Sequence, residues 1–216
     1  MLQKIYPFSF EIAGQLALFA NPTASPNYVS YSFPTLSAVE GWIKSIAHVA
    51  SAQSIVEKVT ICRPIRFHQH MFNNTGFGRK EINIKAGNSE QYRAFCLVDV
   101  TYQVDAYTER SRDFPKEYNE VARKINSAHH LQEKLLQRIA YGVTYNIPFL
   151  GWREFTTSYF GPKRKNTQVF PISMEQKMLI KPFTKYTDGV WNPVFDTVKA
   201  ENGVVYYGDL ARKINV

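Results

Sequence analysis

The first half of the chain changes between the apolar spacing of a strand and that of a helix. Apolar and polar residues alternate over 8–12, which predicts a strand. Helical spacing begins after Pro34 and Thr35, two residues that favour a helix start. The apolar positions that share this spacing are Leu36, Val39, Ile43 and Ile46. The β-branched residues over 55–67 and the apolar pattern over 92–107 predict two further strands.

Two polar segments interrupt this pattern. Residues 68–88 are polar and contain glycine, which predicts a long exposed hairpin or a mobile loop. Residues 110–124 are charged and show no regular spacing, so they predict an irregular connection.

A second helix follows the charged segment. Asn126 or Ser127 can cap its start, and Gly142 ends it. Its apolar stripe consists of Leu131, Leu135 and Ile139. Residues 145–155 then return to an extended pattern. The resulting order of strand, helix, strand, strand, helix and strand is that of a ferredoxin-like fold.

The composition changes after Phe160, where a basic turn leads into short segments broken by proline and glycine. The predicted fold class is therefore α+β. It comprises a ferredoxin-like (RNA-recognition-motif-like) domain over residues 1–160 and a small β-rich appendage over residues 161–216. A ferredoxin-like fold hosts many functions, so it does not decide what the protein does.

The charge of the chain favours a polyanionic partner. The 26 Lys and Arg residues exceed the 18 Asp and Glu residues, which gives a formal net charge of +8. Cations near phosphates release condensed counterions, so a basic excess of this size is typical of nucleic-acid binding, although it carries no sequence specificity. The aromatic content of 14% fits either a packed core or stacking on unpaired bases.

Several protein classes are not favoured by the sequence. No apolar run approaches the ~18 residues of a membrane span, and the first residues lack the pattern of a signal peptide. We therefore expect a cytoplasmic protein that does not contact a membrane. Cys62 and Cys96 lie in apolar runs without metal-ligand spacing, and the pair His68 and His70 supplies only two ligands. The sequence thus predicts no metal and no cofactor.

Four local strings occur in an order and at separations that are typical of one family. They are GQLALF at 14–19, SYSFPTLSAVEG at 30–41, RPI at 63–65 and PFLGWREF at 148–155. On these residues the chain resembles the Cas-five family of CRISPR-associated proteins, most closely its type I-C (Dvulg) branch. The resemblance covers residues 8 to about 160.

This resemblance implies a concrete function. Members of the family have a ferredoxin-like domain, bind the 5′ handle of CRISPR RNA and join other subunits in the Cascade complex. In the I-C branch the protein is also a metal-independent endoribonuclease, which cuts precursor CRISPR RNA at the base of the repeat hairpin and keeps the product. The family further implies that the isolated chain is a monomer.

The catalytic residues of that branch are a Tyr after the first helix motif and a Lys-His pair at the start of the second helix. In this sequence His130 matches the His of the pair, His129 stands at the Lys position and Ala47 stands at the Tyr position. His48, next to Ala47, is the candidate to replace the tyrosine. Free N–H groups in the first turn of a helix attract anions, which fits a phosphate site at His129 and His130. The alternative is an ordinary polar first turn on a solvated helix face.

The candidates for RNA binding are cations from a strand end, a loop and the basic turn, which together suit a groove that follows single-stranded RNA. Tyr31 is added as a side chain that either stacks on a base or belongs to the core. The candidate cations are Arg63, Arg66, Arg79, Lys80, Lys163, Arg164 and Lys165.

Two other functions fit the same residues. The chain can be a non-catalytic Cascade subunit that binds the handle after another enzyme cuts, which the changes at the Tyr and Lys positions favour. It can also be a basic ferredoxin-like binding module with an RNA or protein partner unrelated to CRISPR.

Overall fold

The described residues form a single large sheet with helices packed against it, and its strand pairs are antiparallel except for the short parallel pair of Tyr28–Val29 with residues 94–95. The structure is a computed structural model that describes residues 4–24, 28–75, 80–87, 89–111, 126–187 and 190–214. Nine strands occupy these ranges: β1 (Tyr6–Ala17), β2 (Tyr28–Val29), β3 (Ala52–Ile61), β4 (Phe67–Thr75), β5 (Ser89–Arg110), β6 (Tyr159–Gly161), β7 (Met174–Thr187), β8 (Val190–Glu201) and β9 (Val204–Tyr206). The helices are η1 (Pro22–Ala24), α1 (Leu36–Ile46), α2 (Glu81–Lys85), α4 (Ser127–Tyr141) and α5 (Gly208–Ile214).

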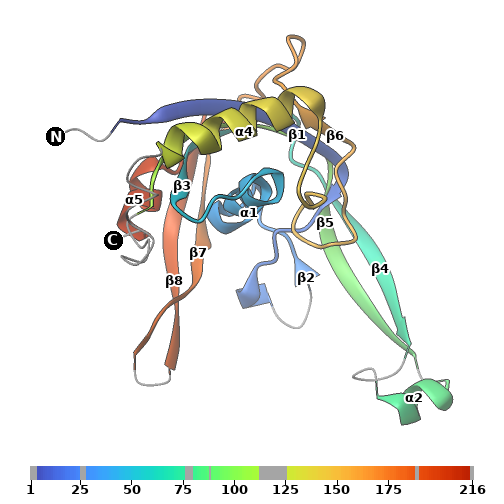
Figure 1. Cartoon of the computed structure of the whole chain (residues 1–216). Helices are drawn as coiled ribbons and strands as arrows, with labels where there is room; N and C mark the ends of the chain where they lie inside the picture. Colours follow the sequence, from blue (N-terminus) through green and yellow to red (C-terminus); the bar gives the residue numbers. More distant parts are fainter. Residues whose placement is uncertain are drawn as a thin grey trace.

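The sheet is organised around the long strand β5. The strand order is β6-β1-β5-β3-β9-β8-β7, and β2 and β4 also pair with β5. The second half of β5 lies between β1 and β3, while its first half pairs with β4 from Phe67↔Leu97 to Thr75↔Ser89. We call the β4–β5 hairpin, with α2 at its tip, the arm, because it extends away from the rest of the molecule (Figure 1). The hairpin predicted over 68–88 is therefore confirmed.

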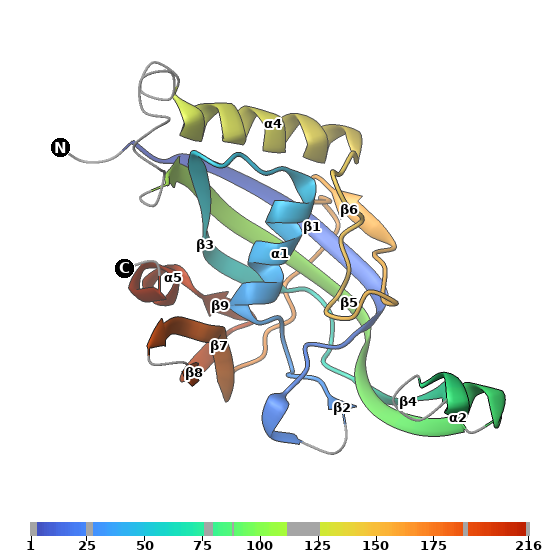
Figure 2. The ribbon, with the colours of Figure 1, turned by 60° about the horizontal axis from the view of Figure 1, so that its bottom comes forward.

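Helices α1 and α4 contact each other and lie on the same side of the sheet (Figure 2). The hydroxyl of Thr35 caps α1 by accepting the N–H of Ala38 at 3.2 Å. The side chain of Asn126 caps α4 by accepting the N–H of His129 at 3.2 Å, and Gly142 ends this helix with φ 66°. Both helices and their boundaries agree with the sequence pattern.

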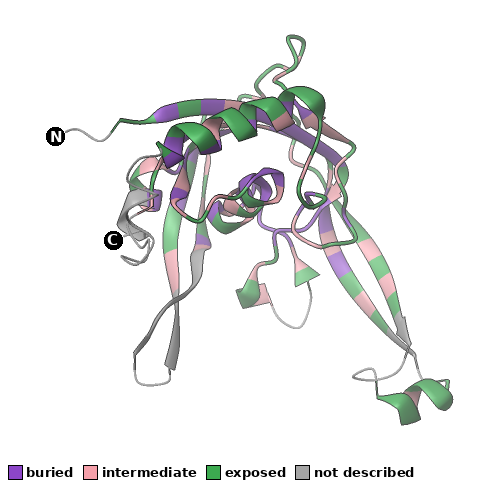
Figure 3. Ribbon diagram, viewed as in Figure 1, coloured by how far each residue is buried: buried purple, intermediate pink, exposed green. Residues whose placement is uncertain are grey.

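The core lies between these helices and the sheet (Figure 3). Successive side chains of a strand point to opposite faces, so β1 directs Phe8, Phe10 and Ile12 toward the helices. The apolar stripes of α1 and α4 complete the same cluster. The opposite face of β1 carries Glu11, which places a carboxylate on the side of the sheet away from the helices.

The C-terminal strands continue the same sheet and share its core. β9 pairs with β3, β8 with β9, and β7 with β8. Val198, Val205 and Tyr207 belong to the same buried cluster as the side chains of β1, and the hydroxyl of Tyr207 donates a hydrogen bond to the carbonyl of Pro34. The division into domains at residue 160 stays a prediction.

Two predicted strands are corrected by the structure. The strand expected over 55–67 ends at Ile61, and the next begins at Phe67, because Pro64 lacks the N–H that a ladder needs. Residues 145–155 do not form a strand: they make an isolated bridge between Phe149 and Thr156, and Gly151 turns the chain with φ 92°. Residues 112–125, most of the segment expected to be irregular, lie outside the described residues.

None of the helices in the described ranges is long and apolar enough to cross a membrane.

Candidate nucleic-acid interface and reaction pocket

A groove of about 840 Å³ lies where the end of β3 meets the segment after β6. It brings together three of the predicted cations, Arg63, Arg164 and Lys165. The rest of its lining consists of Cys62, Pro64, Thr101, Asn166, Thr167, Gln168, Val169 and Phe170. We call this site the basic groove. Its side chains combine positive charge with hydroxyl and amide groups, which is the chemistry that binds phosphate oxygens.

A buried carboxylate holds one wall of the basic groove in place. Glu11 in β1 is 0% exposed, and it accepts hydrogen bonds from Gln103 Nε2 at 3.0 Å, the Arg164 N–H at 3.1 Å and Thr167 Oγ1 at 3.0 Å. The guanidinium of Arg164 donates to it as well. Burial alone would raise the pKa of the Glu11 carboxyl, but the hydrogen bonds from Gln103, Arg164 and Thr167 outweigh it and hold that pKa below its ordinary value.

The cations in and beside the basic groove therefore divide into two kinds. Lys163 Nζ lies 2.6 Å from Asp105 Oδ1, and Arg164 is bonded to Glu11 and lies 4.2 Å from the centre of the Tyr159 ring. These two cations are largely neutralised by the sheet. Arg63 and Lys165 are exposed, and neither takes part in an ion pair within the described part of the chain. They are the cations of the groove that remain available to a phosphate.

The other predicted cations lie away from the basic turn. Arg66 is in the loop between β3 and β4 and forms an exposed ion pair with Asp99 at 3.3 Å. Lys80 is exposed at the start of α2, at the tip of the arm. Arg79 lies outside the described residues.

Tyr31 belongs to the core. Its side chain is 0% exposed, and its hydroxyl accepts the N–H of Leu179 at 3.1 Å. Burial raises the pKa of the Tyr31 phenol. In this conformation the ring offers no surface on which a base could stack, and the neighbouring Phe33 is equally buried.

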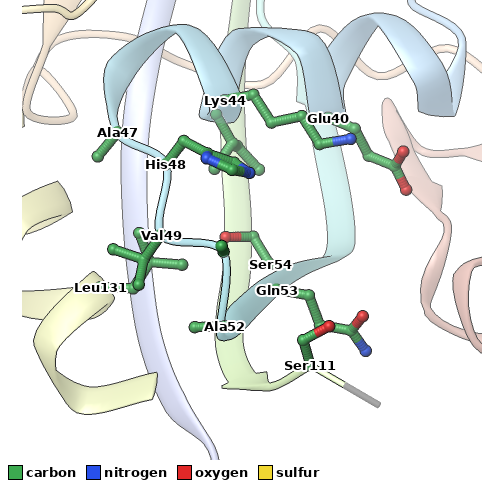
Figure 4. Close-up of a pocket in the computed structure, with 12 residues that line it drawn as sticks. Glu40, Lys44, Ala47, His48, Val49, Ala52, Gln53, Ser54, Ser111 and Leu131 are labelled. Atoms are coloured by element: carbon green, nitrogen blue, oxygen red, sulfur yellow. The ribbon is translucent and has the colours of Figure 1, made fainter. Parts of the chain in front are cut away.

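A second, smaller pocket of about 200 Å³ lies where α1 ends and β3 begins (Figure 4). We call it the α1–β3 pocket. Its floor is apolar, with Ile43, Ala47, Ala52 and Leu131. Its polar side chains are Glu40, Lys44, His48, Gln53, Ser54 and Ser111. His48, predicted from its position next to Ala47, is thus placed in a polar pocket.

His129 and His130 are exposed on the first turn of α4. His129 Nδ1 lies 3.8 Å from Glu133 Oε2, and its ring centre is 5.2 Å from that of Tyr6. The capping side chain of Asn126 occupies one N–H of this turn. α4 contributes Leu131, and neither histidine, to the lining of the α1–β3 pocket.

The start of α4 is nevertheless fixed beside the segment that carries His48. Ser127 Oγ, in the first turn of α4, donates to the carbonyl of Ser51 at 2.9 Å, and Arg138, in the last turn, donates to the carbonyl of Ile46 at the end of α1. The structure therefore brings the segments of the three candidate histidines together, with His48 in the pocket and the other two on the adjacent helix.

No group of three or more His, Cys, Asp or Glu side chains that could hold a metal ion occurs among the described residues. The ring of His70 packs against Phe72 at 4.5 Å, on the arm. Cys62 and Cys96 are buried and not bonded to each other, and burial raises the pKa of each thiol to about 11.

Two residues of these sites were not found from the sequence. Glu11 lies at a polar position of an alternating strand, and nothing in the pattern shows that a later segment covers it. Lys44 lies in the last turn of α1 and His48 follows the helix, so no helical spacing links the two residues, and the sequence pattern did not single out Lys44.

No protein-family model matches the chain. The CRISPR pre-crRNA endoribonuclease Cas5d of Mannheimia succiniciproducens is 23% identical to it over 163 residues, which are 68% of this chain and 69% of that protein.

Two solved structures resemble the whole chain. One, a CRISPR-associated protein, has a TM-score of 0.67 and 20% identity and matches 95% of this chain and 94% of the other. A functionally uncharacterized protein from Streptococcus mutans has a TM-score of 0.68 and 20% identity, over 94% and 93% of the two chains. These likenesses show that the chain shares the mixed α/β fold of both proteins, with its large antiparallel sheet.

Proposed function

We propose that this chain is an RNA-binding CRISPR-associated protein of the Cas-five family that binds the 5′ handle of CRISPR RNA as a subunit of Cascade. The observation that carries this proposal is the basic groove, in which Arg63 and Lys165 are exposed cations beside a rigidly held turn. The similarity to an endoribonuclease that acts on precursor CRISPR RNA, over two thirds of both chains, supports it.

A ferredoxin-like core is part of the proposal. The strands β6, β1, β5 and β3 are adjacent in this order and antiparallel, and α1 and α4 connect them as the helices of a β-α-β-β-α-β unit. We assign the remaining strands after residue 160 to a small appendage. The four sequence strings support assignment to the type I-C branch.

We further propose that the protein is a metal-independent endoribonuclease. A base removes the proton of a 2′-hydroxyl, the 2′-oxygen attacks the adjacent phosphorus, and an acid protonates the leaving 5′-oxygen. The products are a 2′,3′-cyclic phosphate and a free 5′-hydroxyl. The step consumes no water, and the base and acid perform it without a metal ion. His48, His129 and His130 are the candidate base and acid, because the first residue of α4, Ser127, is hydrogen-bonded to Ser51, three residues after His48.

The test is cleavage of the cognate repeat RNA by the purified protein in excess EDTA. We expect one cut, which is lost when the nucleotide at the cut site is 2′-deoxy and when His130 or His48 is replaced by Ala. A cut that persists with the deoxy substrate would rule out the proposed chemistry. Tight binding without any cut would leave a handle-binding protein and overturn the nuclease assignment.

The second candidate is a non-catalytic Cascade subunit that binds the same RNA. Ala47 and His129 at the usual Tyr and Lys positions favour it, and His129 is already close to Glu133. The same experiment separates the two candidates, because only the enzyme converts the RNA that it binds.

A further inference from the structure

The α1–β3 pocket contains a cation that the sequence did not single out. Lys44 comes from the last turns of α1, and His48 from the segment that follows the helix. Figure 4 shows His48 and Ser54 close together below the end of α1, and the side chain of Lys44 along the helix with its ammonium end toward Glu40. The C-terminal end of a helix carries a partial negative charge, which favours a lysine at this place.

The other charged and polar groups of the pocket are already partly occupied. Glu40, the carboxylate in the lining, has an interaction of its own, and Gln53 Nε2 donates to Glu109 Oε1 at 2.7 Å. The backbone N–H of Ser111 donates to the carbonyl of Ser51 at 3.1 Å. The ammonium group of Lys44, the imidazole of His48 and the hydroxyls of Ser54 and Ser111 are the side-chain groups suited to meet a ligand.

The dimensions of the pocket limit what it can take. Its volume of about 200 Å³ is below the roughly 300 to 1,000 Å³ of pockets that enclose a drug-sized ligand. It therefore suits one phosphodiester group of a longer chain, with the flanking nucleotides outside. Ala47, 3% exposed in the floor, leaves this space open where a larger side chain would fill it.

We propose that the scissile phosphodiester of RNA binds in the α1–β3 pocket, with His48 as the group that exchanges protons and Lys44 as the catalytic cation. This proposal rests on the proposed nuclease function. When the 2′-oxygen attacks phosphorus, negative charge grows on the non-bridging oxygens, and an ammonium group beside them stabilises that charge more than it stabilises the bound substrate. Lys44 keeps its three protons throughout, and the proton of the 2′-hydroxyl goes to the imidazole of His48. The P–O5′ bond breaks as the new P–O bond forms, and the leaving 5′-oxygen takes its proton from His129 or His130, the other candidates for the acid.

The experiment compares single-turnover cleavage in EDTA, at saturating protein, for wild type, Lys44→Ala, Lys44→Arg and Lys134→Ala. Lys134 is an exposed lysine of α4 outside the pocket, so its variant is the matched control. We expect Lys44→Ala to slow cleavage about 100-fold or more, as loss of one group that stabilises a developing oxyanion does. RNA affinity should change less than about twofold, Lys44→Arg should recover part of the rate, and Lys134→Ala should match wild type.

A second measurement does not depend on activity. The ring protons of His48, assigned with His48→Gln, are followed by NMR as uncleavable RNA with a 2′-deoxy cut site is added, and we expect them to shift. Cleavage that is unchanged in Lys44→Ala would overturn this proposal and leave the nuclease assignment intact. Absence of cleavage by wild type would overturn both, and binding of the RNA would still be measured.

Discussion

The basic groove and the α1–β3 pocket lie at opposite ends of the same strand. The groove follows Ile61, the last residue of β3, while the pocket includes Ala52, its first. The ten residues of β3 at ~3.3 Å each separate the two sites by roughly 30 Å. They also lie on different sides of the sheet, since the groove is built over Glu11 and the pocket beside the helices.

The two sites differ in how their charges are held. At the groove, ion pairs fix the basic turn to the sheet: Glu11 neutralises the charge of Arg164, and Asp105 neutralises that of Lys163. In the pocket, Glu40 and Lys44 stand on α1 and His48 on the connection that follows it, and Glu40 is the carboxylate among the described lining residues. This difference suggests a division in which the groove holds RNA in a fixed place and the pocket carries out the chemistry. The two functions should therefore separate by mutation.

Replacement of His48 by Ala is expected to give the largest effect. Loss of a positioned general acid or base slows a reaction about 10²- to 10⁴-fold. Cleavage in EDTA should fall by this factor while the Kd for uncleavable repeat RNA stays unchanged. His68→Ala, a substitution of an exposed histidine on the arm, is the control and should cut at the wild-type rate. An equal loss of binding and cleavage would contradict the separation of the two sites.

Glu11→Gln tests whether the sheet organises the groove. The substitution leaves the volume nearly unchanged but weakens the hydrogen bonds from Arg164 and Thr167, and hydrogen bonds to a charged group contribute about 1.5–3 kcal/mol. We expect the free energy of unfolding to fall by about 2 kcal/mol in chemical denaturation at pH 7. Unchanged stability would show that the carboxylate is dispensable.

The same residue predicts an acid dependence. The pKa of Glu11 in the folded protein lies below the ordinary value of about 4.3, so its stabilisation is complete above that pH and is lost as the pH falls through the folded pKa. Thermal melts between pH 5 and pH 3 should therefore show a smaller acid-induced loss of stability for Glu11→Gln than for wild type. Parallel curves of melting temperature against pH for the two proteins would show that Glu11 does not cause the acid-induced loss of stability.

The double variant Arg63→Ala and Lys165→Ala tests the groove as an RNA site. Removal of two phosphate contacts from a single-stranded ligand should lower the slope of log K against log salt by about 1.4 and weaken binding roughly tenfold. Cleavage at saturating protein should stay at the wild-type rate. Lys199→Ala, which removes a cation paired with Glu175 at 3.8 Å, is the control, and an equal change of slope in it would contradict the assignment.

Tyr31→Phe is expected to have the smallest effect. It removes the acceptor of the Leu179 N–H and should destabilise the protein by about 1 kcal/mol. RNA affinity should not change, because the ring is buried. A substantial loss of affinity without a loss of stability would instead place the hydroxyl of Tyr31 at the RNA.

The sequence predicted the features of the fold that depend on residues close together along the chain. Thr35 and Asn126 cap the starts of α1 and α4, and Gly142 ends α4, as expected, because caps act within one turn of the chain. The extended pattern of 145–155 was misleading, since apolar residues such as Leu150 and Phe155 enter the core from a loop.

The basic groove was less accessible to sequence reasoning. Its cations were predicted as a set, but the carboxylate that organises them lies 153 residues away from Arg164 along the chain. Spacing and propensity carry no information about such a contact. The same holds for Tyr31, whose burial depends on β7 packing beside it.

The pairing of strand β5 predicts how local unfolding varies along its length. Its 22 residues begin in the arm, where β4 is the main partner, and end in the body between β1 and β3. Backbone amides should therefore exchange with solvent deuterium quickly near Ser89 and most slowly near Val104, with protection rising along one continuous strand. The hydrogen bonds between β4 and β5 can then break from the tip of the arm, while those of β5 with β1 and β3 remain intact.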